Sequence, residues 1–465
     1  MQYEKNRSVK GVALTSGQRF PLTIKRLGIN GEGIGYFKHK VVFVPNALPA
    51  EVIVAEVVRD NPHYATAKVH KIREKSPHRV AKRDDYDVGG IELEQLAYEK
   101  QLEFKRDIIM QSLEKFKPRG YRHFILKQTL GMKVPYEYRN KAQFQVRQNE
   151  RGEVVAGLYK RGTHELVALP TFSTQRPLTM KIMRIVCSLL QKYEVPIYNE
   201  QQNSGIVKTL VVRESVATGQ AQLVFVTNSP KFPHKKPLLA ELQQAVPQLS
   251  SVMQNINMNQ DALIWGAETN LLAGQDFIVD QLGTVKFKLS ARAFFQLNPS
   301  QTEVMYRKVE EALALEKGET LIDAYCGVGG TIGLFVGGQH ASEVRGMDIT
   351  PAAITDARAN AQLNKRTNTR YECGKAEEVI PQWIKEGFVA DALVVDPPRT
   401  GLDSELLKTI ITVRPRKFVY VSCNPATLAR DLKELVKVYQ VEYIQPIDMF
   451  PQTARSEAIV KLTLR

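Results

Sequence analysis

The chain has 465 residues, a length that predicts two to four domains rather than one. Its hydrophobic fraction of 43% is that of a globular protein with real cores, and the absence of any apolar run near ~20 residues excludes a membrane-spanning helix. The net charge of +15 favours a polyanionic partner over an inert basic surface or attraction to a membrane surface.

The cysteines are spread along the chain, and none forms a close Cys-x-x-Cys pair. They are Cys187, Cys326, Cys373 and Cys423. Their spacing gives no sign of a zinc site or of a disulfide framework, and no N-terminal signal sequence is visible. These features predict a cytoplasmic protein with free thiols.

Residues 12–74 predict a small β-barrel, because short strand-like segments alternate there with turn signals. The segments are Phe20–Lys25, Lys40–Val44, Glu51–Val58 and Tyr64–Val69. Basic and aromatic side chains such as Arg26, Tyr36 and Tyr64 are interleaved with them. A charged groove with stacking rings is typical of barrels that bind single-stranded nucleic acid, although such rings also serve as core or ordinary surface.

Residues 75–285 predict a central RNA-binding domain of mixed α and β structure. It begins with a long charged helix over 95–116, for which packing on the next domain is an alternative. Its strand-like segments include Gln143–Val146, Val154–Tyr159, Leu210–Arg213 and Gln222–Val226. The chain contains no internal repeat.

Residues 286–465 alternate between strands and helices, which indicates a parallel sheet with helices on both faces. The predicted elements are strands at Thr320–Ala324, Glu343–Asp348, Asp391–Val395 and Lys417–Val421, and a helix at 352–364. The fold class is therefore α/β, with a Rossmann-like last domain.

A cofactor pattern begins where the first of these strands ends. Asp323 is followed by the glycine-rich loop Tyr325–Gly330, and Asp348 ends the second strand, where a carboxylate suits ribose hydroxyls. The loop lacks both the dinucleotide fingerprint and a Walker lysine. With the later Asp396-Pro-Pro stretch, the pattern favours S-adenosylmethionine over a plain glycine turn.

The stretch Asp396-Pro-Pro-Arg399 directly follows an apolar strand, so its carboxylate is expected in the same cleft. Enzymes that methylate exocyclic amines use similar loops, normally with an aromatic residue where this chain has Arg399. An arginine can hold a phosphate or a carbonyl oxygen instead. The pattern therefore weighs against amine methylation.

Cys423 lies between a strand end and a predicted helix that begins with an Asn424 cap and Pro425. A thiol at the positive end of a helix dipole is expected to have a lowered pKa and to act as a nucleophile. A buried structural cysteine is the alternative. We interpret Cys326 and Cys373 as structural cysteines, because neither begins a helix with Asn-Pro.

Five motifs together resemble the bacterial RNA uracil-5-methyltransferases, most closely those that modify 23S ribosomal RNA. The motifs are Phe294–Asn298, Asp323–Gly329, Asp396–Gly401, Val421–Asp431 and Asp448–Thr453. The resemblance covers essentially the whole chain. Members of this group carry an N-terminal TRAM barrel, which residues 12–74 resemble, whereas the tRNA-specific branch usually lacks it.

The resemblance implies a role for each matching residue. Cys423 is the nucleophile that adds to carbon 6 of uracil, and Glu457 is the general base that removes the proton from carbon 5. Asp396 contacts the substrate ring as well as the cofactor. The implied contacts to S-adenosylmethionine are Gln296, Tyr325, Asp348 and Asp396.

Three departures from the family pattern stand out. Many relatives hold a [4Fe-4S] cluster through cysteines, but this chain has other residues there, so no iron–sulfur cluster and no other metal is expected. Those residues are Asp84, Val88, Ile91 and Phe172. Gly330 replaces an asparagine that contacts the cofactor, and Arg455 replaces a histidine before Glu457.

The expected partner is 23S ribosomal RNA, bound by a monomer that makes no contact with a membrane. A target uridine in a loop must be flipped out of its stack before reaction. Three alternatives remain open: a tRNA uracil-5-methyltransferase, an RNA cytosine-5-methyltransferase, and an inactive RNA-binding ribosome-assembly factor. The motifs do not say which uridine is modified, or whether there is more than one.

Overall fold

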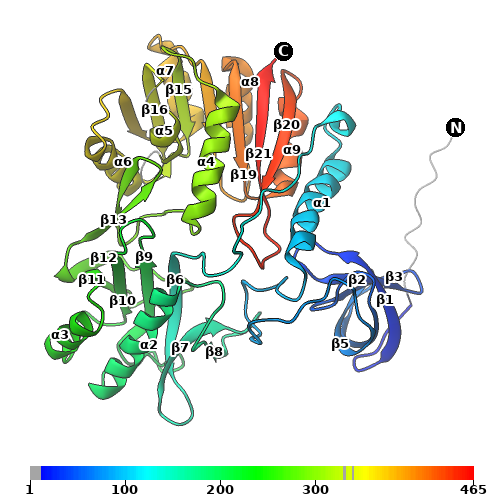
Figure 1. Ribbon diagram of the computed structural model, residues 1–465, viewed down its shortest axis with the longest axis vertical. Coiled ribbons are helices and arrows are strands. Elements are labelled where there is room, and N and C mark those ends of the chain that lie inside the picture. The colour runs from blue at the N-terminus through cyan, green and yellow to red at the C-terminus, as the bar shows by residue number, and fades with distance from the viewer. Residues whose placement is uncertain (1–11, 328–330, 338–339) are drawn as a thin grey trace.

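The computed structural model describes residues 12–327, 331–337 and 340–465. Figure 1 shows a barrel (blue), a central sheet (teal to green) and a C-terminal sheet flanked by helices (green to red). Helix α1 (Tyr98–Phe116) runs from the barrel along the side of the C-terminal sheet. None of the helices in the described part of the chain combines the length and the apolar character that a membrane crossing requires.

The barrel closes in the strand order β1-β2-β3-β5-β4. Its strands are β1 (Arg19–Leu27), β2 (Gly33–Phe37), β3 (Lys40–Val44), β4 (Val52–Asp60) and β5 (Tyr64–Glu74). Alternate residues point inward, as the period of two in a strand requires; Phe20, Leu22 and Ile24 of β1 are all buried in the barrel core. The small barrel predicted from the sequence is confirmed, and it has five strands.

The central sheet has the order β12-β11-β10-β9-β6-β7-β8 and is antiparallel except between β10 and β11. Its strands are β6 (Lys141–Gln148), β7 (Val154–Tyr159), β8 (Leu166–Ala168), β9 (Val207–Glu214), β10 (Ala221–Thr227), β11 (Leu249–Ile256) and β12 (Glu268–Gly274). Helices α2 (Pro177–Lys192) and α3 (Lys235–Ala245) form a hydrophobic core with the sheet.

The C-terminal sheet has the order β17-β16-β15-β18-β19-β21-β20. Its strands are β15 (Thr320–Ala324), β16 (Glu343–Asp348), β17 (Thr369–Cys373), β18 (Ala392–Val395), β19 (Lys417–Ser422), β20 (Tyr439–Ile447) and β21 (Glu457–Leu464). The first five are parallel, whereas β21 is antiparallel to both of its neighbours, β19 and β20. The predicted α/β fold with a Rossmann-like domain is confirmed.

Helices cover both faces of this sheet and bury alternate strand residues. One core contains residues of α4 (Pro299–Leu313), α5 (Thr331–Val336) and α6 (Pro351–Leu363). The opposite core contains residues of α7 (Ala376–Lys385), α8 (Ser404–Val413), α9 (Pro425–Leu435) and α1. Helix α1, far earlier in the chain, is therefore part of the C-terminal core and packs on α9.

A hairpin of β13 (Phe277–Leu282) and β14 (Val285–Ser290) crosses residue 286, where the sequence predicts the last domain to start. Strand β14 packs against α6, and Phe287 of β14 is fully buried in the core of the C-terminal domain. We therefore propose that this hairpin is counted with the C-terminal domain.

Candidate active site

The parallel strands bring predicted site residues to one edge of the C-terminal sheet. Asp348 ends β16, Tyr325 follows β15, Asp396 follows β18, and Cys423 follows β19. These strands are neighbours in that order, so their carboxyl ends meet at the same edge. In open α/β sheets this is the edge at which ligands bind.

Glu457 reaches the same edge by a different route, because it begins the antiparallel strand β21. In the β19–β21 ladder, Ser422 pairs with Ala458. Continuing this register by one residue places Glu457 directly opposite Cys423. Directly opposed residues of antiparallel strands have neighbouring side chains. The register thus puts a carboxylate beside the thiol.

The turn around Cys423 has the predicted local structure. The Asn424 side chain accepts a hydrogen bond from the Ala426 N–H at 3.1 Å, and Pro425 is the first residue of α9. The Asn424 side-chain amide also donates to the Arg399 carbonyl at 2.8 Å. These bonds join the Cys423 turn to the loop that carries Asp396, so the two segments hold one another in place.

The carboxylates at this edge are held in an apolar setting. Burial raises the pKa of Asp396 to about 7, and no described residue donates a hydrogen bond to its side chain. Burial, followed by the neighbouring Asp396, raises the pKa of Glu457 to about 8, against the opposing effect of Lys105. Paired carboxyls with raised pKa values are typical of sites that move protons near neutral pH.

The predicted lowering of the Cys423 pKa is wrong for the free enzyme. Burial, followed by the carboxylates of Glu457 and Asp396, raises the pKa of this thiol to about 11. Arg399 opposes the shift only in part. The sequence pattern identified the helix N-terminus but not the two acids that the fold brings to the same place.

Alkylation of the free enzyme tests this environment. With a pKa of about 11, the thiolate fraction of Cys423 at pH 7 is about 10⁻⁴, and its iodoacetamide reaction rate should rise about tenfold per pH unit up to that value. Peptide mass spectrometry resolves Cys423 from the exposed Cys373, which serves as an internal reference for the reagent. A rate that levels off below pH 8 would contradict the raised pKa.

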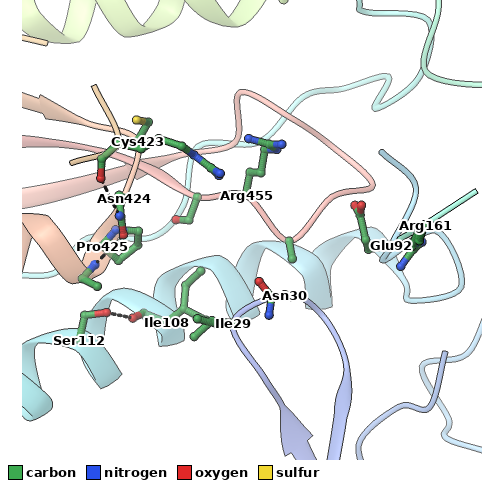
Figure 2. Close-up of a pocket in the computed structure, with 14 residues that line it drawn as sticks. Ile29, Asn30, Glu92, Ile108, Ser112, Arg161, Cys423, Asn424, Pro425 and Arg455 are labelled. Carbon is green, nitrogen blue, oxygen red and sulfur yellow. Dashed lines mark hydrogen bonds between the residues drawn. The ribbon is translucent and has the colours of Figure 1, made fainter. Parts of the chain in front are cut away.

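A cavity of about 530 Å³ opens beside Cys423 (Figure 2). Its walls come from the barrel loop with Ile29 and Asn30, from α1, and from the turns that carry Cys423 and Arg455. No ion pair or side-chain hydrogen bond joins the Arg399 or Arg455 guanidinium to another described residue. The mouth of the cavity therefore presents cations that are available to a polyanion.

A second cavity, of about 1040 Å³, lies against the barrel. It shares Asn30, Glu92 and Arg161 with the cavity beside Cys423, so the two adjoin. Its lining includes Phe43 and Tyr64, whose rings meet edge to face with centroids 5.6 Å apart. Side chains of this kind can stack on unpaired bases.

On the cofactor side of this sheet edge, a turn with an uncommon backbone conformation lies beside carboxylates. Tyr325 has a φ of 65°, a left-handed conformation that is uncommon outside glycine and that gathers at functional sites. Among the described residues, nothing packs where a Gly327 side chain would begin, and the Gly327 N–H donates to Asp348 at 3.1 Å. This open turn beside Asp348 and Asp396 fits a nucleoside donor. Gly330 lies outside the described residues.

Gln296 lies between β14 and α4, and the structure joins it to the site only indirectly. Its carbonyl accepts a hydrogen bond from Asn140 at 3.3 Å. Asn298 of the same motif caps α4 and donates to the Met449 carbonyl at 3.0 Å. Through Met449, the motif contacts the segment that leads to Glu457.

The residues at the cluster positions of many relatives do not fit a [4Fe-4S] cluster. Val88, Ile91 and Phe172 are buried in the apolar core beside the central sheet, and Asp84 accepts a hydrogen bond from the Ser173 N–H at 2.7 Å. None of these side chains can supply a thiolate. Within the described ranges, no group of three or more His, Cys, Asp or Glu residues is arranged to hold a metal ion.

The sequence reasoning missed Lys105, which is fully buried next to the segment that carries Glu457. In the sequence it is one lysine in a highly charged helical pattern, where a solvated position is the ordinary expectation. The Asp448–Thr453 motif is recognisable in the sequence, but the sequence assigns no role to Asp448. The signal that links the two residues is tertiary, because more than 300 positions separate them.

Comparisons with known proteins agree with this architecture. The family described as tRNA (Uracil-5-)-methyltransferase matches residues 97–465, and the TRAM domain family matches residues 13–70. An uncharacterized RNA methyltransferase of Lactiplantibacillus plantarum is 59% identical, over 97% of this chain and 93% of its own length. One from Listeria monocytogenes is 52% identical, over 97% and 98%.

Among solved structures, the chain is similar to the tRNA (uracil-54, C5)-methyltransferase of Pyrococcus abyssi in complex with S-adenosyl-L-homocysteine. The TM-score is 0.76 at 25% sequence identity. The match covers 96% of this chain and 100% of the archaeal one, so the barrel, the central sheet and the C-terminal domain share one overall arrangement.

Proposed function

The chain belongs to the RNA uracil-5-methyltransferase family and is an S-adenosylmethionine-dependent RNA (uracil-5-)-methyltransferase, and from this premise we propose that it methylates carbon 5 of uridine in 23S ribosomal RNA. The observation that carries the proposed chemistry is the end of the β19–β21 ladder, where Cys423 directly follows Ser422 and Glu457 directly precedes its partner Ala458. A nucleophile and a carboxylate base are the two groups that this reaction requires.

Cys423 begins the proposed reaction. Carbon 5 of uracil is a poor nucleophile until the thiolate adds to carbon 6, which forms an S–C6 bond and shifts electron density to carbon 5 and oxygen 4 as an enolate. S-adenosylmethionine, when bound, supplies an electrophilic methyl group on a sulfonium. Arg399 and Arg455 line the same cavity, where a guanidinium can hold the oxygen-4 charge or a flanking phosphate.

Glu457 completes the cycle. After methyl transfer, carbon 5 carries both the new methyl group and its original proton, and the cysteine cannot leave while that proton remains. The Glu457 carboxylate takes the proton, the C5–C6 double bond re-forms, and the S–C6 bond breaks to release the thiolate. Asp396 follows β18, the strand between β15 and β19, and we propose that it contacts the uracil ring as well.

The residues proposed to hold the methyl donor are Gln296, Tyr325, Asp348 and Asp396. Asp348 ends β16, where its carboxylate can accept hydrogen bonds from ribose hydroxyls. No described atom packs where a Gly327 side chain would begin, and the Asp396 carboxylate, to which no described residue donates a hydrogen bond, offers a negative charge to the sulfonium.

The adjoining cavities support RNA as the macromolecule that fills this space. An unpaired strand could place its target uridine beside Cys423 and continue past Asn30 to the rings of Phe43 and Tyr64. The barrel supports the ribosomal assignment, because the bacterial enzymes that this chain resembles carry one when they act on 23S RNA.

Transfer RNA is the second candidate, and a specific observation favours it. The Pyrococcus abyssi enzyme is a tRNA methyltransferase, and its match with this chain extends across nearly the whole of both. The barrel therefore supports the ribosomal assignment without excluding tRNA.

Unmodified transcripts of 23S RNA, 16S RNA and tRNA, each incubated with the purified protein and methyl-labelled S-adenosylmethionine, separate these candidates. We expect 5-methyluridine in 23S RNA alone, and fragment mapping then counts the modified positions. Label confined to tRNA would replace the ribosomal proposal with the second candidate. RNA binding without methylation of any transcript would favour an assembly factor instead.

A further inference from the structure

One face of α1 is directed at the segment that leads to Glu457. Tyr98, Gln101 and Lys105 are spaced by three and four residues, so they lie on the same side of the helix. All three contact Asp448–Ser456, the connection between β20 and β21. The next residue in the chain is Glu457.

Lys105 is the centre of these contacts. Its side chain is fully buried, and its ammonium forms an ion pair with Asp448, which is also fully buried. The ammonium donates a second hydrogen bond to the Phe450 carbonyl at 2.8 Å. The Tyr98 hydroxyl donates to the other oxygen of Asp448 at 2.9 Å, so both carboxylate oxygens are fixed from α1.

The far end of the segment is held by the same helix. The Gln101 amide donates to the Gln452 side chain at 2.8 Å and accepts from the Gln452 N–H at 3.0 Å. Gln452 has a φ of 68°, an uncommon conformation for a residue with a side chain. The Ser456 hydroxyl donates to the Lys105 carbonyl at 3.0 Å, one residue before Glu457.

An ion pair buried this completely is not explained by stability alone. Removing two charges from water costs free energy that their attraction does not reliably return, and apolar residues of similar size are often as stable. The pair does, however, fix one position for the segment. It also places a cation near Glu457, whose pKa the neighbouring acids Asp396 and Asp448 raise.

We propose that Lys105 is a positioning residue for proton removal, because its ion pair with Asp448 sets the place of Glu457 opposite Cys423 and its ammonium supports the ionised form of that base. This role rests on the proposed function of Glu457. It gives α1, the helix that begins beside the barrel, a part in the last chemical step.

The charges around Glu457 give the expected direction of a pH effect. The groups that act on it are Asp396, Asp448, Arg455, Lys105 and, across the ladder, Cys423. Burial and the acids raise the pKa of Glu457, whereas Lys105 and Arg455 lower it. Loss of Lys105 should therefore move the pH dependence of proton removal upward from about 8.

A single-turnover assay with methyl-labelled S-adenosylmethionine and the RNA substrate tests the proposal. It follows the methylated protein–RNA adduct, which survives denaturing electrophoresis, and the free methylated RNA that proton removal releases. In Lys105→Met we expect release to be about ten- to a hundredfold slower relative to methyl transfer, so that adduct accumulates. The midpoint of the release rate should also move to higher pH.

Two further variants keep the outcome decisive. Lys105→Met combined with Asp448→Asn removes both buried charges, and it replaces the single variant if that one does not fold. Lys100→Met is the matched control, because Lys100 lies on the same helix and pairs near the surface with Glu103 at 2.8 Å. It should release RNA at the wild-type rate.

The outcomes separate this proposal from the one on which it rests. If Glu457→Gln accumulates adduct while the folded Lys105 variants release RNA at the wild-type rate and with the wild-type pH profile, the role of Lys105 alone is overturned. If Glu457→Gln accumulates none although wild type methylates RNA, the base assignment and this proposal both fail.

Discussion

Cys423→Ala is expected to lower methylation by a factor on the order of 10⁴ or more, because alanine cannot form the bond to carbon 6 that activates carbon 5. The same variant should form no protein–RNA adduct that survives denaturation. Its affinity for RNA should change little, since the substitution removes no positive charge. Initial rates with saturating RNA and cofactor, together with a binding assay, measure both effects.

Cys187→Ala is the matched control for this substitution. Cys187 is buried in α2 of the central domain, where burial raises its pKa to about 12, and it lies outside the catalytic sheet. Both variants lose one thiol, but only one should lose the reaction. Equal activity of wild type and Cys423→Ala would remove the covalent mechanism from consideration.

Glu457→Gln is expected to separate methyl transfer from release. Glutamine keeps the size of the side chain but cannot take the carbon-5 proton, so each enzyme molecule should transfer about one methyl group and remain attached to the RNA. Turnover should fall about 10²- to 10⁴-fold, the range typical of a lost general base. The measurement is the molar ratio of labelled adduct to enzyme.

The raised pKa of Glu457 adds a pH signature to this result. Only the ionised carboxylate can accept the proton, and with a pKa of about 8 roughly a tenth of it is ionised at pH 7. The release rate of the wild type should therefore rise with pH and level off above about 8. Glu434→Gln on α9, which removes an exposed carboxylate paired with Lys437, should leave both rate and profile unchanged.

Much of this architecture could be predicted from the sequence because its signals are local. Apolar strands that end in Asp348, Asp396 and Cys423 alternate with helices, and parallel strands that alternate with helices bring their carboxyl ends to one edge. The Asn424 cap is equally local, since its hydrogen bond reaches only two residues along the chain. The alternating pattern of the barrel strands is likewise contained within each strand.

The features that were not predictable depend on contacts between distant segments. No local signal in the sequence shows that β21 pairs with both β19 and β20. This pairing is what brings Glu457 close to Cys423. The thiol pKa was predicted with the wrong sign for the same reason, because the acids that raise it come from other strands. Lys105 resembles a solvated helix residue until its partner, Asp448, is known.

The position of β21 between β19 and β20 means that the parts of the site are synthesised in a fixed order. Both neighbours of this strand, β19 and β20, precede it in the chain. A ribosome that has synthesised residues 1–456 has therefore produced the thiol, the barrel and the cofactor edge, but not the base. Closing the sheet then requires β21 to pair with β20 through the short connection Asp448–Ser456 and with β19 on its other side. During synthesis, the nascent chain thus contains the proposed nucleophile before it contains the proposed base.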